Sequence, residues 1–246
     1  MKTKIINITI CILIGIFVIL FPVISGIIVG ITNMEGAIIL FLKAFFMLLP
    51  IIIFIILILL KKINGKDIRL VTNVNKKNYL YYLPVVLVYI PVLIGGFVWK
   101  GSAYFFGNLL LYLAVGIAEE LYFRGIIPHL LEKDFKKEPV ILIYSLIFGL
   151  GHAASAFANN NPIVVVLTIL NALIFGFLAI CLLYKTKTIV PLMIIHFLFD
   201  FETKFIALEG NDLSIAEGVR GSIMLIYAII LFVLIRKTSK SEVMGN

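Results

Sequence analysis

Long apolar runs separated by short polar segments are the dominant pattern along this chain. A transmembrane helix needs about 20 consecutive, predominantly apolar residues. The runs predict about eight such helices, at 5–30, 36–60, 79–99, 103–131, 139–156, 162–183, 189–208 and 221–235. The fifth and eighth are shorter than usual, and 103–131 carries charged residues within it. The predicted fold class is therefore all-α, in the form of a polytopic membrane protein.

The polar segments between these runs predict the orientation in the membrane. Most of the 21 Lys and Arg residues fall in loops on one side, among them the basic loop 61–77. Within loops on the other side, only Lys100, Lys204 and Arg220 are basic. Because basic residues are enriched in cytoplasmic loops, we expect both termini to be cytoplasmic.

Composition supports a single membrane domain over residues 1–246. The chain is 62% hydrophobic and 14% charged, whereas about a quarter of the residues in a soluble domain are charged. The net charge of +8 is explained by basic loops, so we expect membrane lipid and not nucleic acid as a partner. Cys11 and Cys181 form no metal or disulfide pattern. The oligomeric state is left open.

Ionisable residues within the apolar runs are the candidates for chemistry, because charges inside a bilayer are costly and mark functional sites. Glu120 and Arg124 are four residues apart on 103–131, so they share a helix face and are expected to pair. Glu119 is rotated about 100° from that face, and its charge is not directly compensated by the arginine. A carboxylate of this kind suits general acid–base catalysis. Lys43 stands alone in 36–60 and is given no role.

Two other runs carry histidines. His152 follows Phe148 by four residues in 139–156, and His196 and Asp200 are four residues apart in 189–208. Counted from the expected cytoplasmic helix ends, the depths are ~18 Å for Glu119, ~20 Å for His152, ~11 Å for His196 and ~17 Å for Asp200. These similar depths predict one internal site, reached from the cytoplasmic half of the membrane.

The three motifs resemble those of the CPBP family, also known as CAAX protease and bacteriocin-processing or Abi proteins. The family pattern is Glu-Glu-x-x-x-Arg, then Phe-x-x-x-His, then His-x-x-x-Asn/Asp. It is matched here by Glu119-Glu120-x-x-x-Arg124, Phe148-x-x-x-His152 and His196-x-x-x-Asp200. The motif region, about 103–208, covers under half of the chain. The expected eight spans are also similar to the family.

The resemblance implies intramembrane endopeptidase activity. By analogy, Glu119 and His152 activate a water molecule, and His196 and Asp200 support the oxyanion. Glu120 and Arg124 are structural partners, and Phe148 packs the site.

The cofactor is left open at this stage. An oxyanion needs donors, and Asp200 donates only when it is protonated, whereas an aspartate also suits a metal. Glu119, His152, His196 and Asp200 form a possible ligand set for zinc or another divalent metal. Because the chain has no His-Glu-x-x-His motif, we favour a metal-free, glutamate-type hydrolase over a metalloprotease.

The expected substrate is a membrane-associated or lipidated peptide or protein that enters from the membrane or the cytoplasm. Abundant Ile and Lys and short loops indicate a bacterial plasma membrane, where bacteriocin maturation, self-immunity or cleavage of a membrane regulator are the expected roles. One alternative is a non-proteolytic scaffold or immunity protein that retains the fold. Another is a proton-coupled transporter, which is expected to show internal repeats; none is visible in the sequence.

Overall fold

The computed structural model describes residues 2–70, 74–157 and 162–244. The regular structure in these ranges is helical, and a single isolated antiparallel bridge joins Phe97 and Ile206. The all-α fold class predicted from the sequence is therefore confirmed.

The helical elements follow one another with short connections. In chain order they are α1 (Lys2–Thr32), α2 (Ile38–Leu59), the 3₁₀ helix η1 (Lys76–Val88), α3 (Ile90–Leu93), α4 (Ser102–Glu119), the π-helix η2 (Glu120–Ile126), α5 (Ile127–Leu131), α6 (Lys137–Gly151), the 3₁₀ helix η3 (His152–Phe157), α7 (Pro162–Thr186), α8 (Val190–Glu202) and α9 (Gly210–Met244).

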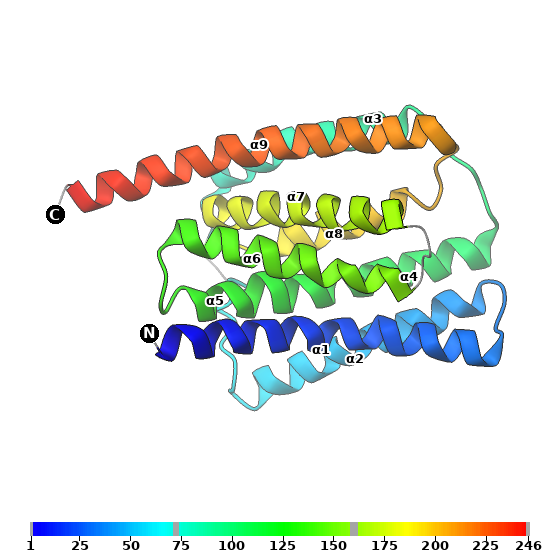
Figure 1. Ribbon diagram of the computed structural model, residues 1–246, viewed down its shortest axis with the longest axis horizontal. Coiled ribbons are helices and arrows are strands. Elements are labelled where there is room, and N and C mark those ends of the chain that lie inside the picture. The colour runs from blue at the N-terminus through cyan, green and yellow to red at the C-terminus, as the bar shows by residue number, and fades with distance from the viewer. Residues whose placement is uncertain (1, 71–73, 158–161, 245–246) are drawn as a thin grey trace.

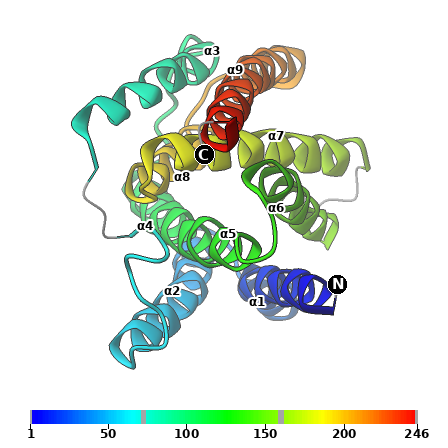
Figure 2. The same ribbon diagram turned by 90° about the vertical axis from the view of Figure 1, so that its left-hand side faces the viewer.

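The helices pack side by side in a bundle (Figure 1). Viewed from its end, α1 and α2 form one flank, and α3 and α9 form the opposite flank (Figure 2). Between these flanks, α4 packs against α2 and α8, while α7 packs against α6 and α9. The helices that carry the three motifs are therefore inside the bundle.

Among the residues that the structure describes, five helices are long and apolar enough to cross a membrane. They are Lys2–Thr32, Ile38–Leu59, Lys137–Ala156, Pro162–Thr186 and Asp212–Thr238. They agree with the prediction of a multi-pass membrane protein, whereas the count of about eight spans stays a prediction.

The three other predicted spans take different forms. Segment 79–99 is mostly η1 followed by the four-residue α3, where Pro84 and Pro91 each lack the backbone N–H that a helical hydrogen bond requires. Segment 103–131 is a continuous helical path of α4, η2 and α5, and it contains the charged motif. Segment 189–208 is helical only as far as Glu202, the end of α8.

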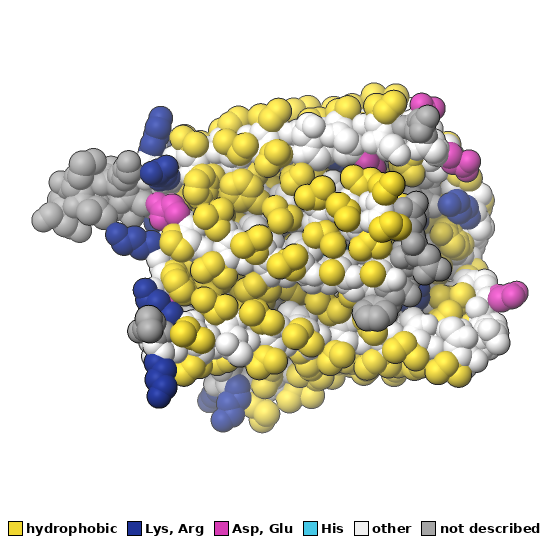
Figure 3. Space-filling model, viewed as in Figure 1, with side chains coloured by type: hydrophobic (Ala, Val, Ile, Leu, Met, Phe, Trp, Pro, Cys, Tyr) yellow, Lys and Arg dark blue, Asp and Glu magenta, His cyan; other side chains and the backbone are white. Residues whose placement is uncertain are grey.

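Both ends of the chain lie at the same end of the bundle (Figure 1). On the face shown in Figure 3, Lys and Arg side chains gather at this end, and hydrophobic side chains cover the middle of the bundle. This separation agrees with the charge pattern of the sequence. That the basic end is cytoplasmic stays a prediction.

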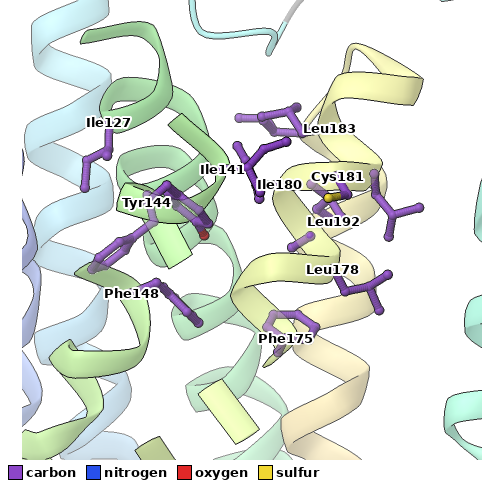
Figure 4. Packing of buried hydrophobic residues seen from close by; sticks show 14 of the residues in the cluster. Ile127, Ile141, Tyr144, Phe148, Phe175, Leu178, Ile180, Cys181, Leu183 and Leu192 are labelled. Carbon is purple, nitrogen blue, oxygen red and sulfur yellow. The ribbon is translucent and has the colours of Figure 1, made fainter. Parts of the chain in front are cut away.

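The core beside the motif helices is built from aromatic and aliphatic side chains. Tyr144 and Phe148 of α6 lie on the side of their helix that faces α7, with Phe175 and Leu178 opposite (Figure 4). Gly116 brings α4 against α8, because a Cβ at this position would lie 2.9 Å from the backbone oxygen of Met193. This close approach occurs one turn before the two glutamates, so it fixes the separation of the helices at the site.

Candidate active site

The two glutamates of the first motif lie where the helix changes its type. Helix α4 ends at Glu119, and the π-helix η2 begins at Glu120. Single π turns of this kind are frequent at functional sites. The adjacent side chains enter different surroundings: Glu120 is 0% exposed, whereas Glu119 is 17% exposed.

Glu120 joins its own helix to α8. Its Oε1 atom lies 2.8 Å from Arg124 Nη1 and accepts a hydrogen bond of 2.8 Å from His196 Nδ1. The Arg124 contact is an ion pair without hydrogen-bond alignment. The spacing of four residues predicts the pair with Arg124, but it carries no information on the contact with His196, which comes from a distant segment. Glu120 is therefore also a positioning residue for that histidine.

Arg124 is surrounded by aromatic rings. Its guanidinium carbon lies 4.0 Å from the ring centre of Phe148, 5.3 Å from that of Phe175 and 5.5 Å from that of Tyr144. Such cation–π contacts stabilise a desolvated cation. Phe148 also packs against His152, with ring centres 4.9 Å apart. The sequence did not indicate Phe175 as a residue of the site, because its helix carries no charged motif.

His196 is nearly enclosed, at 5% exposure of its side chain. With Nδ1 donating to Glu120, Nε2 is the second nitrogen, and it lies 3.8 Å from Glu119 Oε2 and 3.7 Å from Asp200 Oδ2. Both distances are beyond a direct hydrogen bond. The ring therefore lies among three carboxylates, which stabilise positive charge on it by Coulomb attraction.

Glu119 and His152 line the same cavity, which has a volume of about 690 Å³. Cavities of about 300–1,000 Å³ are typical of ligand sites. Glu119 Oε2 is buried and has no hydrogen-bond partner among the described residues. His152 Nδ1 donates to the Phe148 carbonyl oxygen at 3.0 Å, which leaves Nε2 as its second nitrogen for other contacts. Glu119 thus lines a space that water or a ligand can occupy, and its Oε2 atom lies 3.8 Å from His196 Nε2.

The cavity extends from the middle of the bundle toward the end opposite the termini. Its walls come from the second half of α1, the beginning of α2 and the end of α6 with η3. Ile27 of α1 lines the cavity and is 55% exposed, so the cavity reaches the outer surface there. This cavity lies away from the half of the bundle that contains the termini, and access to the site from the cytoplasmic half stays a prediction. The depth of a residue along its own helix does not indicate which space between neighbouring helices opens to the outside.

The predicted residues are thus brought together in two connected groups. Five of them, Glu119, Glu120, Arg124, His196 and Asp200, form a continuous ionic cluster. His152 reaches this cluster through the shared cavity and the ring of Phe148. Within residues 2–70, 74–157 and 162–244, no group of three or more His, Cys, Asp or Glu side chains is arranged to hold a metal ion.

A second buried ionic cluster was not predicted from the sequence. Arg220 was assigned to a loop, but it lies within α9, and its side chain is fully buried. Its guanidinium donates to Glu202, to Glu217 and to the Phe199 carbonyl oxygen. This cluster ties α9 to the end of α8 that carries Asp200.

Comparison with known proteins agrees with this geometry. Residues 101–201 match the model of the type II CAAX prenyl endopeptidase Rce1-like family, and this segment contains all three motifs. No curated protein and no solved structure matches the chain. Residues 101–201 of this chain are thus similar to the Rce1-like CAAX endopeptidases, in agreement with the resemblance of the motifs.

Proposed function

We propose that the protein is an intramembrane endopeptidase of the glutamate type, with Glu119 as its general base. The observation that carries this proposal is the position of the Glu119 side chain, which is 17% exposed and lines a cavity shared with His152. The similarity of residues 101–201 to an endopeptidase family supplies the reaction class. A scaffold would gain nothing from a costly ionisable side chain on the wall of a cavity within the membrane.

Hydrolysis at this site requires one water molecule. Glu119 takes a proton from the water while the water oxygen bonds to the carbonyl carbon of the scissile peptide. The carbon–nitrogen bond then breaks, and the leaving amine takes the proton from Glu119. His152 orients the water through Nε2, since its Nδ1 is bonded to the Phe148 carbonyl oxygen.

The negative charge on the former carbonyl oxygen needs donors. We assign this role to the Nε2–H of His196 in its imidazolium form, which the surrounding carboxylates stabilise; Nε2 lies 3.8 Å from Glu119 Oε2. Asp200, 3.7 Å from the same nitrogen, orients the ring and is the second candidate donor when protonated. Glu120 and Arg124 hold His196 in place from its Nδ1 side.

The proposed substrate is a membrane-associated or lipidated peptide that enters laterally. Much of the cavity wall is apolar, and at Ile27 the cavity reaches a surface of α1 covered by exposed aliphatic side chains. Bacteriocin maturation or self-immunity in a bacterial plasma membrane is the proposed physiological setting. This setting rests on family-level analogy alone.

The proposal is tested with purified protein in liposomes and a library of quenched fluorescent membrane peptides, half of them acylated or prenylated. Wild type is expected to release defined fragments detectable by mass spectrometry, and His152→Ala is expected to lower the rate by at least ~100-fold. Cleavage is expected to persist in a strong chelator, with no stoichiometric zinc in the preparation. Loss of cleavage on chelation and its return with zinc would replace the glutamate mechanism with a metal-dependent one.

A further inference from the structure

Lys43 contributes an unpaired cation to the cavity that contains Glu119. It lies near the beginning of α2 and is half-buried on the cavity wall. No ion pair links its ammonium to a carboxylate anywhere in the described ranges. An ammonium in such apolar surroundings is costly unless it meets an opposite charge. The described part of the chain therefore supplies no carboxylate that pairs with this cation.

We infer that Lys43 is a specificity-determining residue that binds a carboxylate of the substrate peptide. The inference rests on the proposed peptidase function and names a chemical feature of its substrate. Among the cavity-lining residues, Lys43 is the cation, and the other polar side chains are Glu119, His152 and Ser155. A basic group on the substrate would be repelled by Lys43, whereas a carboxylate gains a charge-assisted hydrogen bond.

The substrate carboxylate and the scissile bond must both fit into the same cavity. Lys43 and Glu119 border one cavity of about 690 Å³, which is the size of a small-ligand pocket. The carboxylate and the cleaved bond must then lie on the same short segment. Without a cation, a substrate carboxylate in this space would be repelled by the negative charge of Glu119. Lys43 therefore allows an anionic segment to approach the proposed base.

The carboxylate can come from two sources, the C-terminus of the peptide or an Asp or Glu side chain. Two matched peptide pairs distinguish them: a free C-terminal acid against its amide, and an internal Asp against Asn in an amidated peptide. For wild type we expect kcat/KM to favour the carboxylate member of one pair by roughly tenfold or more. The pair that shows the preference identifies the source.

Variants of Lys43 then test the residue itself. In Lys43→Met and Lys43→Gln the preference is expected to fall to about one, and in Lys43→Arg it is expected to remain. Lys100→Met is the matched control, because Lys100 is an exposed lysine outside the cavity, just before α4. This control is expected to keep the wild-type preference. Two variants that remove the charge are used, so that the test remains valid if one of them misfolds.

Binding separates this inference from the peptidase proposal. Fluorescence polarisation of the same labelled peptides is measured on Glu119→Gln protein, with and without Lys43→Met. A carboxylate preference in binding that Lys43→Met removes, without cleavage by wild type, would refute the peptidase and support the anion site. Equal binding and equal kcat/KM within both pairs would overturn the role of Lys43. If the effect of Lys43→Met on peptide binding depends only on the phosphatidylglycerol content of the nanodiscs, Lys43 binds a lipid headgroup. That result would also overturn the role of Lys43 in substrate binding.

Discussion

Two adjacent carboxylates are proposed to have different roles because their surroundings differ. Glu120 is enclosed by Arg124 and His196, whereas Glu119 is partly exposed and lines the cavity. Helical spacing was enough to predict the pair of Glu120 with Arg124 and the separate direction of Glu119. The hydrogen bond from His196 to Glu120 was beyond prediction, because it depends on how α8 packs against α4. The role of Lys43 was missed for the same reason, since the cavity lies between helices distant in sequence.

The buried ion pair predicts non-additive effects on stability. Glu120→Leu leaves Arg124 charged and fully buried without its partner, which typically costs about 3–5 kcal/mol. Adding Arg124→Leu removes the stranded charge, so the double variant is expected to unfold at a higher temperature than Glu120→Leu alone. Thermal unfolding in detergent measures this difference. Simple addition of the two single effects would show that the pair is not coupled in the folded protein.

Substitutions of Asp200 distinguish the need for a polar group from the need for a charge. Its Oδ2 atom lies 3.7 Å from His196 Nε2, on a side chain that is 30% exposed. Asp200→Asn keeps a polar partner and adds an amide donor, so we expect kcat within about tenfold of wild type, whereas Asp200→Leu is expected to lose about 100-fold or more. Steady-state cleavage of one peptide measures both. An Asn variant as inactive as the Leu variant would show that the carboxylate charge itself is required.

At the scale of elements, apolar run length was a reliable guide to the long helices. It predicted the five helices with membrane-spanning length, but it did not reveal that 79–99 is largely a 3₁₀ helix. The π-helix at Glu120–Ile126 was also hidden, because the hydrophobic pattern does not separate α from π hydrogen bonding over so few residues. Glu120 and Arg124 were thus placed on the right segment, but with an ideal α-helical geometry that the structure does not have.

The contact of α4 with α8 predicts a strong effect at Gly116. A Cβ at this position would lie 2.9 Å from the Met193 backbone oxygen and 3.0 Å from the Phe197 backbone nitrogen. Since neither backbone atom can move freely, Gly116→Val is expected to destabilise the protein by about 1–3 kcal/mol and to reduce cleavage. Gly218→Ala in α9 is the control, because nothing lies within 4 Å of its added Cβ. Equal unfolding temperatures for wild type and Gly116→Val would contradict the close helix contact.

At the scale of the whole molecule, charge separates the two ends of the bundle. The chain termini lie at one end, while the cavity extends toward the other. Sequence alone predicted the basic end from the loop charges, but not the position of the cavity, because an opening depends on the packing of α1 beside α2 and α6. If the basic end is cytoplasmic, as the charge pattern predicts, the cavity opens in the opposite half of the membrane.

The orientation is testable by cysteine labelling. In a background where Cys11 and Cys181 are replaced by Ala, Lys100→Cys is expected to react with a membrane-impermeant maleimide added to intact cells. Lys62→Cys, after α2 at the basic end, is expected to react only once the membrane is opened. The measurement is the labelled fraction by mass shift. Labelling of Lys62→Cys in intact cells would reverse the predicted orientation.

The central claim is that the carboxylate of Glu119 on the cavity wall activates the water that cleaves a peptide within the membrane. The most direct measurement compares single-turnover cleavage by wild type and Glu119→Gln in liposomes, with the exposed Glu35→Gln as the matched control. We expect Glu119→Gln to be at least ~100-fold slower with an unchanged unfolding temperature, and Glu35→Gln to match wild type. Cleavage by Glu119→Gln at the wild-type rate would contradict the assignment.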